Sequence, residues 1–295
     1  MRCLVLGGAG MLGHRLWQEL RRRGETYVTL RRPFSDYAGL GLFEEARSID
    51  RFDACDEEAV ARAYERSRPQ VVFNAIAVLK QRPEGGDPVA HLKLNALLPH
   101  LLARRCAAAQ ARLIHISTDG VFSGRRGSYT EADTPDAEDL YGRSKLLGEV
   151  EGPGTLTFRT CIVGRELASQ HGLLEWFLSQ RGRRVRGYSH ALFNGFATPA
   201  LASILADIAY QHPSLEGLWH LSGQAISKLE LLRLANRIYG VGAEIEADGE
   251  LRCDRTLDSS RLRARIAYAA EPWDVTLEAL RADPLPYDAW VPSRA

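Results

Sequence analysis

The chain places a tyrosine and a lysine four positions apart, Tyr141 and Lys145, in the motif Tyr-Gly-Arg-Ser-Lys. On a helix, residues at this spacing share a face, so the phenol and the ammonium group can lie side by side. A nearby cation favours the phenolate form and lowers the pKa of a tyrosine. Such a tyrosine can pass its proton to a carbonyl oxygen while hydride arrives at the carbonyl carbon. The spacing also occurs by chance, so this chemistry requires elements that hold a hydride donor nearby.

Hydroxyl and carboxyl groups directly follow an apolar run, in Ser117-Thr118-Asp119. The run is a predicted strand, and ligands of open α/β sheets bind beyond the carboxyl ends of the strands. The Thr118 hydroxyl can hydrogen-bond the same substrate oxygen as Tyr141 there. The alternative is that Thr118 only forms a turn. Another predicted strand ends in the same way, and three of its residues are expected to line a cofactor: Asn74, Ala75 and Ala77.

A glycine turn lies near the start of the chain, where Gly7-Gly8-Ala9-Gly10-Met11-Leu12-Gly13 follows a predicted strand and opens a predicted helix. One glycine permits a tight turn, another lets a diphosphate approach the helix, and the last lets the helix pack closely on the sheet. Backbone N–H groups and the helix dipole then hold the phosphate charge. The alternative is a structural turn without a ligand. We predict a dinucleotide site built by Gly7, Gly10, Met11, Leu12 and Gly13.

The end of the second predicted strand indicates which dinucleotide binds. Folds that bind NAD carry an acid at this place, whereas this strand ends in Arg31 and Arg32. Two guanidinium groups suit the 2′-phosphate of NADP(H). The alternative is a solvated pair of surface arginines. Asp53, which follows Phe52, is expected to flank the adenine.

Short apolar runs alternate with helical patterns through the first half of the chain. Strands are expected at residues 3–6, 27–30, 71–74, 113–116 and 156–160, helices at 11–23, 57–66, 87–109 and 141–149, and a loop at 31–47. This alternation favours a parallel sheet covered by helices on both faces, a Rossmann-like doubly wound α/β fold. The later pattern is looser, with helices expected at 173–180, 199–211 and 228–239 and short strands at 185–187 and 218–221.

The change of pattern predicts two domains. Residues 1–160 form the NADP-binding domain, to which the chain is expected to return around residues 190–215. Residues 161–295 form mainly a smaller, mixed α/β substrate-binding lobe.

The composition excludes several classes of protein. Of the 295 residues, 45% are hydrophobic and 25% charged, as in ordinary globular domains. The net charge of +1 and the lack of a basic stripe argue against nucleic-acid binding. No apolar run is long enough for a membrane helix and the N-terminus does not resemble a signal peptide, so a cytoplasmic location away from membranes is expected. The five cysteines lack CxxC spacing and are expected to be buried thiols, and no metal site is expected.

Together these motifs resemble the extended short-chain dehydrogenase/reductase superfamily, and within it the dTDP-4-dehydrorhamnose reductase family. The resemblance covers nearly the whole chain. The matching segments lie at residues 7–13, 74–77, 95–96, 117–124, 141–149, 158–160, 217–222 and 257–262.

The resemblance implies a role for each matching residue. Tyr141 is the expected proton donor, Lys145 binds the nicotinamide ribose and tunes Tyr141, and Thr118 hydrogen-bonds the keto oxygen. Ser117 is a near neighbour of Thr118, and Asn95 is a structural or relay residue on its helix. Both are expected beside the cofactor. The implied reaction is NADPH-dependent reduction of a nucleoside-diphosphate 4-keto-6-deoxyhexose, dTDP- or UDP-linked, to a sugar donor for polysaccharide assembly. The expected substrate-binding residues are Lys80, Thr118, Asp119, Tyr141, Arg159, Asn194 and Arg255.

Three points stay open at this level. The substrate diphosphate has three candidate cations, Arg252, Arg255 and Lys80, and Arg255 could instead form a surface ion pair with Asp254 or Asp258. The sugar, the base and the oligomeric state are undetermined, with a homodimer as one option. The alternative functions are a nucleotide-sugar epimerase or dehydratase of the same superfamily, or a non-catalytic NADP-binding regulatory subunit.

Overall fold

The computed structural model describes residues 1–80, 83–167 and 169–290. The chain divides into two compact units. Unit 1 comprises residues 1–117, 139–158 and 201–218, and unit 2 comprises residues 118–138, 159–200 and 219–295. The binding roles that the sequence assigns to residues 1–160 and 161–295 stay a prediction.

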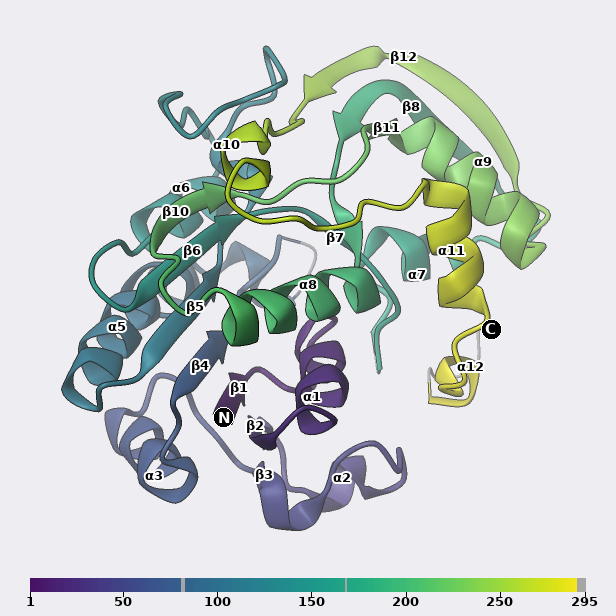
Figure 1. Cartoon of the computed structure of the whole chain (residues 1–295). Helices are drawn as coiled ribbons and strands as arrows, with labels where there is room; N and C mark the ends of the chain where they lie inside the picture. Colours follow the sequence, from purple (N-terminus) through teal and green to yellow (C-terminus); the bar gives the residue numbers. More distant parts are fainter. Residues whose placement is uncertain (81–82, 168, 291–295) are drawn as a thin grey trace. The chain divides into compact units, whose positions relative to one another are not determined.

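Unit 1 is built on a seven-stranded sheet with the order β10-β6-β5-β4-β1-β2-β3 (Figure 1). Its strands are β1 (Arg2–Leu6), β2 (Glu25–Thr29), β3 (Ser48–Ile49), β4 (Val71–Asn74), β5 (Arg112–Ile116), β6 (Thr155–Arg159) and β10 (Gly217–His220). The pairings from β3 to β6 are all parallel. The strand order reverses direction at β1, and the predicted doubly wound α/β fold is therefore confirmed.

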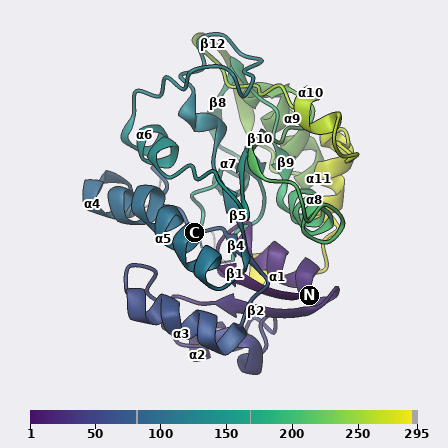
Figure 2. The ribbon, with the colours of Figure 1, turned by 60° about the vertical axis from the view of Figure 1, so that its left-hand side comes forward.

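Helices cover both faces of this sheet, as Figure 2 shows. On one face, α3 (Glu57–Ser67) and α5 (Leu98–Ala108) pack on the inward side chains of β1, β4 and β5 in one hydrophobic core. The other face carries α1 (Gly13–Arg21) and α8 (Thr198–Gln211). Arg23, just after α1, donates to Asp207 of α8 at 2.5 Å. The strands are thus buried on both sides, which leaves their ends as the accessible part of the sheet.

Unit 2 has its own sheets and its own core. A three-stranded sheet has the order β11-β8-β12, and a two-stranded sheet pairs β7 with β9. The strands are β7 (Ile162–Val163), β8 (Arg184–Phe193), β9 (Phe196–Ala197), β11 (Ile226–Ser227) and β12 (Glu244–Asp254). The helices are α7 (Leu173–Leu178), α9 (Lys228–Tyr239), α10 (Ser260–Arg263), α11 (Trp273–Arg281) and α12 (Tyr287–Trp290). Apolar side chains of α7, α9 and α11 form the core with β8.

Several local predictions need correction. The expected loop at 31–47 contains a short helix, α2 (Ser35–Ala38), and a 3₁₀ turn, η1 (Glu45–Arg47). The strand expected at 185–187 is the longer β8, and the sequence does not predict β12. Cys55 is exposed, so not every thiol is buried as predicted. Cys3 and Cys106 are buried and Cys161 and Cys253 half-buried.

The helix expected at 87–109 has a different internal geometry. It begins at α4 (Pro88–Ala90), continues as a π-helix, η3 (His91–Leu97), and ends as α5. The Asp87 carboxylate accepts a hydrogen bond from the Val89 amide and caps the start. Within the described ranges, none of the helices has the length and apolar character needed to cross a membrane.

Candidate functional site

The glycine turn of unit 1 depends on close backbone contacts. Gly7 has a φ of +83°, a conformation that favours glycine. The Gly10 amide donates to the Gly7 carbonyl at 2.9 Å. A Cβ on Gly13 would lie 2.0 Å from that same carbonyl oxygen. The positions of Gly7 and Gly13 therefore require glycine if α1 is to start this close to β1.

The N-terminus of α1 offers backbone donors. No side chain caps this helix. The amides of Met11, Leu12 and Gly13 make no hydrogen bond to any residue in the described part of the chain. Unpaired amides at a helix N-terminus, approached over glycine, suit a diphosphate. The turn can therefore hold the diphosphate of a dinucleotide.

The two arginines that follow β2 belong to the same unit as the glycine turn. Both Arg31 and Arg32 are exposed. The Arg32 amide donates to the Tyr37 hydroxyl at 3.4 Å. Asp53 is exposed as well, and its carboxylate accepts from the Cys55 amide at 2.8 Å. Two solvent-accessible cations in the same unit as the glycine turn can bind a 2′-phosphate, whereas the Asp53 carboxylate accepts a hydrogen bond within a local turn.

The ends of β1, β4 and β5 lie side by side, because Leu6 pairs with Asn74 and Asn74 with His115. The Asn74 amide nitrogen donates to Nδ1 of His115 at 3.1 Å, and its oxygen accepts from the Ile76 amide. Burial lowers the pKa of His115 well below its usual value, and the nearby Lys145 ammonium lowers it further. The predicted cofactor residue Asn74 is therefore held in one orientation by a neutral histidine.

The segment after β4 runs against the glycine turn. A Cβ on Gly7 would lie 3.0 Å from the Ile76 side chain and 3.2 Å from the Ala75 carbonyl oxygen. Ala75 and Ala77 are both half-buried. The small side chains leave the turn and this segment in close contact, and a cofactor-lining role for Ala75 and Ala77 stays a prediction.

Lys145 is buried on α6 (Leu140–Leu147), with 1% of its surface exposed. Its ammonium group donates to the Ile116 carbonyl at the end of β5, at 2.7 Å. Burial lowers the pKa of Lys145 to about 8, although Glu149 opposes the shift. The Ser117 hydroxyl donates to Glu149 at 2.8 Å. The end of β5 and the Tyr-Lys helix are therefore fixed to each other.

Tyr141 lies one turn before Lys145 on α6 and is half-buried. Its ring meets the His91 ring edge to face, with 6.4 Å between centroids and an interplanar angle of 76°. The Asp139 carboxylate caps the helix by accepting from the Gly142 amide at 2.8 Å. Helix α6 therefore presents the phenol and the ammonium group from one face, as the motif predicts.

Asn95 lies in the π-helix η3 and is fully buried. Its oxygen accepts from the Val78 amide at 2.8 Å, and its nitrogen donates to the Val78 carbonyl at 3.0 Å. The same nitrogen is 3.1 Å from the Ser144 hydroxyl. Asn95 thus joins the segment after β4 to α6, and direct cofactor contact by its side chain stays a prediction.

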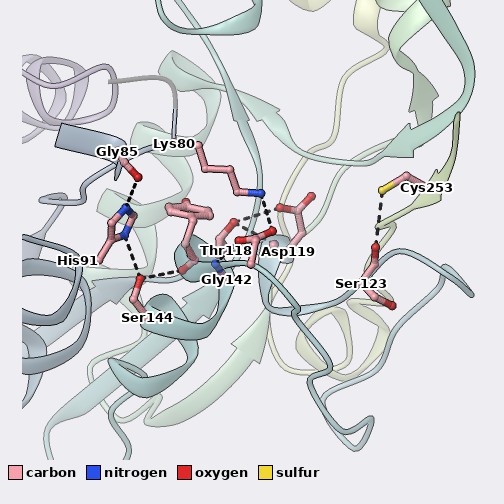
Figure 3. A network of polar contacts seen from close by, with 12 residues as sticks. Lys80, Gly85, His91, Thr118, Asp119, Ser123, Gly142, Ser144 and Cys253 are labelled. Atoms are coloured by element: carbon pink, nitrogen blue, oxygen red, sulfur yellow. Dashed lines mark hydrogen bonds and ion pairs between the residues drawn. The ribbon is translucent and has the colours of Figure 1, made fainter. Parts of the chain in front are cut away.

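Lys80 also joins two parts of unit 1. Its ammonium group forms an ion pair with Asp139, the residue that caps α6 (Figure 3). The two side chains are 44% and 34% exposed. The ion pair gives Lys80 a structural role at the start of α6, and its substrate role stays a prediction.

Thr118 and Asp119 begin the part of unit 2 that follows β5. The Thr118 hydroxyl donates to the Asp119 carboxylate at 3.1 Å and accepts from the Gly120 amide at 3.0 Å (Figure 3). It caps a 3₁₀ turn, η4 (Asp119–Val121), so the turn-forming alternative describes its contacts. Burial raises the pKa of Asp119, while Arg255 and Thr118 oppose the shift. Donation from Thr118 to a substrate oxygen would require this hydroxyl to leave Asp119.

The candidate diphosphate cations differ in their surroundings. Arg252 is exposed on β12, whereas Arg255 is half-buried. The Arg255 Nε is buried and has no hydrogen-bond partner among the described residues. The alternative ion pairs with Asp254 or Asp258 do not occur in the described ranges, and these carboxylates accept from Thr256 and Ser260. Of the two arginines, Arg255 is the better candidate for an anion.

Two predicted substrate residues are engaged inside unit 2. The Arg159 guanidinium is buried 5.1 Å from the Phe122 ring centroid, and its Nη1 is 3.3 Å from His220. The Asn194 amide group makes two hydrogen bonds to the Leu257 backbone, at 2.8 and 2.9 Å. Both contacts stabilise the unit, and substrate binding by these side chains stays a prediction.

Two residues near the Tyr-Lys helix escaped the sequence reasoning. Asp139 had a signal, because an aspartate directly before a predicted helix is a frequent N-cap. His91 carries no such sequence signal, because its role depends on contacts of its ring to the Gly85 carbonyl and to Ser144, which is 53 residues away. Within the ranges that the structure describes, no group of three or more His, Cys, Asp or Glu side chains could hold a metal ion.

Comparison of the sequence with known proteins shows the family to which the chain belongs. The model of the family described as RmlD substrate binding domain matches residues 1–246. The methionine adenosyltransferase 2 subunit beta of Danio rerio is 26% identical over 291 residues, covering 86% of this chain and 83% of that protein. The dTDP-4-dehydrorhamnose reductase of Mycolicibacterium smegmatis is 32% identical over 150 residues, covering 50% of this chain and 40% of that protein.

A solved structure agrees with this assignment at the level of the fold. The dTDP-4-dehydrorhamnose reductase of Bacillus anthracis, solved in complex with NADP, has a TM-score of 0.77 and 19% identity. The match covers 95% of this chain and 98% of that one. With the family model matched over residues 1–246, the chain belongs to the RmlD substrate binding domain family.

Proposed function

We propose that this protein is an NADPH-dependent reductase of a nucleoside-diphosphate 4-keto-6-deoxyhexose. One observation carries the proposal. Tyr141 and Lys145 lie one turn apart on α6, and the Lys145 ammonium is held by the Ile116 carbonyl at the strand end. In the same unit the glycine turn and Asn74 lie at the ends of neighbouring strands. This is the arrangement that a hydride transfer with coupled protonation requires.

The residues of unit 1 suit NADP(H). The amides of Met11, Leu12 and Gly13 are available to the diphosphate, and a Cβ at Gly13 would close the turn. Arg31 and Arg32 supply positive charge for the 2′-phosphate. The similarity to a family member solved with NADP also supports this cofactor. When bound, NADPH supplies the hydride that reduces the keto carbon.

The protein's own residues handle the proton and the ribose. Tyr141 donates its phenolic proton to the sugar oxygen that becomes the alcohol. The Lys145 ammonium favours the tyrosinate that remains and binds the nicotinamide ribose. Thr118 hydrogen-bonds the keto oxygen after releasing Asp119. Arg255, whose side chain is half-buried, receives the substrate diphosphate through its guanidinium group.

The substrate class rests on the family and on Arg255. The name of the Mycolicibacterium smegmatis relative supports a dTDP-linked 4-dehydro sugar. UDP-linked sugars are the other candidates. The product is a 6-deoxyhexose donor for polysaccharide assembly in the cytoplasm, and a homodimer is the proposed assembly.

A substrate panel tests the proposal. The purified chain is mixed with NADPH and a series of dTDP- and UDP-linked 4-keto-6-deoxyhexoses, and the absorbance at 340 nm is followed. Oxidation of NADPH with at least one sugar, lost in Tyr141→Phe, is the expected result. A flat trace with every sugar, from a protein that still binds NADPH, would contradict the reductase.

A second function is supported by a different observation. The similarity to methionine adenosyltransferase 2 subunit beta extends over 86% of this chain. A non-catalytic NADP-binding regulatory subunit is therefore the alternative. It predicts NADPH binding without turnover and a change in the activity of a catalytic partner, which co-purification with a methionine adenosyltransferase would reveal.

A further inference from the structure

His91 is a fully buried histidine of unit 1 that the proposed reaction does not use. It opens the π-helix η3, and Figure 3 shows its ring between Gly85 and Ser144. Its Nδ1 is 3.0 Å from the Asn95 amide nitrogen and 3.2 Å from the Ser144 hydroxyl. Its Nε2 is 3.1 Å from the Gly85 carbonyl oxygen. One ring thus contacts both the chain after β4 and the helix of Tyr141.

The Gly85 carbonyl determines which ring nitrogen carries the hydrogen. A carbonyl oxygen only accepts, so Nε2 of His91 donates to Gly85, and Nδ1 of the neutral ring is the acceptor. The Asn95 nitrogen, which also donates to the Val78 carbonyl, faces Nδ1 as a donor. The Ser144 hydroxyl donates to the Tyr141 carbonyl at 2.9 Å. His91 therefore has two distinguishable sides, an acceptor side toward Asn95, next to Ser144 of α6, and a donor side toward Gly85.

The donor side of His91 holds the chain at Gly85 through the hydrogen bond from Nε2 to the Gly85 carbonyl. A Cβ on Gly85 would lie 2.3 Å from the Lys80 carbonyl oxygen, so Gly85 and Lys80 pack against each other. Lys80 in turn forms the ion pair with Asp139, which caps α6. The segment after β4 therefore reaches α6 twice, through His91 and through Lys80.

We propose that His91 is a positioning residue for the reductase, which holds α6, and with it Tyr141 and Lys145, in register with the segment that follows β4. It acts through Asn95 and Ser144, and the inference rests on the proposed function. The acceptor side sets the position of α6, and the donor side sets the position of residues 85–86.

Two conservative variants separate the two sides, because asparagine reproduces the Nδ1 position of histidine and glutamine the Nε2 position. His91→Gln keeps the Gly85 contact and loses the contacts to Asn95 and Ser144. It should lower kcat by about tenfold, the rate equivalent of one hydrogen bond, with KM for both substrates within about twofold. His91→Asn keeps the acceptor side and should retain kcat within about twofold.

A matched control comes from α5, the helix that continues directly from η3. The His100 Nε2 donates to the Leu147 carbonyl at the other end of α6, at 2.7 Å, and His100 is exposed. His100→Asn removes this contact and should leave kcat unchanged. Equal kcat values for His91→Gln and His91→Asn, or the same loss in His100→Asn, would overturn the proposal.

Hydrogen exchange provides a readout that does not need turnover. Amides of residues 140–147 should exchange faster in His91→Gln but not in His91→Asn, and those of residues 85–86 should show the reverse. If the wild-type protein reduces no sugar, the proposed function fails, and this exchange pattern alone decides whether His91 positions α6. Identical exchange in both variants and the wild type would refute it.

Discussion

The Lys145 ammonium nitrogen lies 2.7 Å from the carbonyl oxygen of Ile116, the last residue of β5. A charged amine is thus held in a place that water does not reach, since 1% of the residue is exposed. The arrangement costs stability, because burial disfavours the charged form. A costly buried charge at the end of a parallel strand is typical of a functional site.

Replacing Lys145 should stabilise the protein in a pH-dependent way. Below pH 8, Lys145 is charged in both the folded and the unfolded chain, and the folded state bears the full cost of burial. Between about pH 8 and pH 10.5 the unfolded chain holds the proton more tightly, so the cost vanishes as the pH rises. Lys145→Met should raise the free energy of unfolding at pH 7 by up to about 3 kcal/mol.

Urea denaturation of the cofactor-free protein and its variant at pH 7 and pH 10 checks this prediction. The advantage of Lys145→Met should be smaller at pH 10. Comparing the two proteins removes the contributions of groups that they share, such as Cys3, whose pKa burial raises to about 12. The same difference at both pH values would mean that Lys145 does not titrate as burial predicts.

The preference for NADPH over NADH should depend on Arg31 and Arg32. Charge-assisted hydrogen bonds contribute about 1.5–3 kcal/mol, so the preference should be at least about tenfold. Arg31→Ala with Arg32→Ala should remove most of it, as fluorescence titration with both cofactors would measure. The control is Arg22→Ala with Arg104→Ala, which removes the same charge from exposed positions. A double variant that still prefers NADPH would assign the specificity to other residues.

Tyr141→Phe should abolish turnover and leave NADPH affinity close to that of the wild type. The ring keeps its packing against His91, and only the transferable proton is lost. Loss of a general acid costs about 10²- to 10⁴-fold in rate. Steady-state kinetics and a binding titration together make the measurement, with Tyr188→Phe as a control. An active Tyr141→Phe enzyme would exclude Tyr141 as the proton donor.

Arg255→Ala should raise the KM for the nucleotide sugar by about one to two decades, because about 1.5–3 kcal/mol of charge-assisted binding is lost. NADPH affinity should not change, since the proposed cofactor residues all belong to unit 1. Arg265→Ala, which removes an exposed arginine of unit 2 with no proposed ligand role, is the control. An unchanged KM in Arg255→Ala would mean that Arg255 does not bind the diphosphate, and Lys80 or Arg252 would become the candidate ligand.

Substitutions of Lys80 and Asp139 should have non-additive effects on kcat, because the two side chains form one ion pair. Asp139→Asn keeps a side chain that can cap α6 and removes only the negative charge that pairs with the Lys80 ammonium group. Because the ion pair is partly exposed, Lys80→Gln and Asp139→Asn should each lower kcat by no more than about fivefold. The double variant should be no worse than either single one. A large rise in KM for the sugar in Lys80→Gln alone would make Lys80 a substrate ligand.

The elements that the sequence predicts best are those whose signals are local. The predicted helix 228–239 has the bounds of α9, because Ser227 and Glu230 form a capping box and Gly240 ends the helix with a φ of +61°. The strand at 71–74 has the bounds of β4, whose four residues are all buried. Such signals need no knowledge of the tertiary structure.

Elements without a local signal were missed. Strand β12 has the sequence Glu-Ile-Glu-Ala-Asp-Gly-Glu-Leu-Arg-Cys-Asp, and most of it is exposed. Its charges give no apolar alternation, and it is a strand because it pairs with β8. The sequence predicts an ordinary helix at the π-helix η3, because the insertion of one residue in a turn leaves no mark on composition.

In the candidate site, too, some features follow from local sequence signals and others depend on the tertiary structure. The glycine turn, the Tyr-Lys spacing and the strand-end hydroxyls are readable as motifs. The donation from Thr118 to Asp119 depends on a side-chain rotamer, and the unpaired Nε of Arg255 depends on what packs around it. Neither can be derived from the spacing of residues along the chain.

The π-helix makes one stretch of unit 1 sensitive to chain length rather than to side-chain identity. The Leu98 amide donates to the Lys93 carbonyl, five residues back, so the segment accommodates one residue more than an α-helix would. Deleting a single residue between His91 and Asn95 would let the segment wind as an ordinary α-helix and would shorten the separation of these two residues from four positions to three. The contacts of Asn95 to Val78 and His91 depend on the present separation. Homologues that differ here by one inserted or deleted codon should therefore differ in how they support the Tyr-Lys helix, even where the motif itself is unchanged.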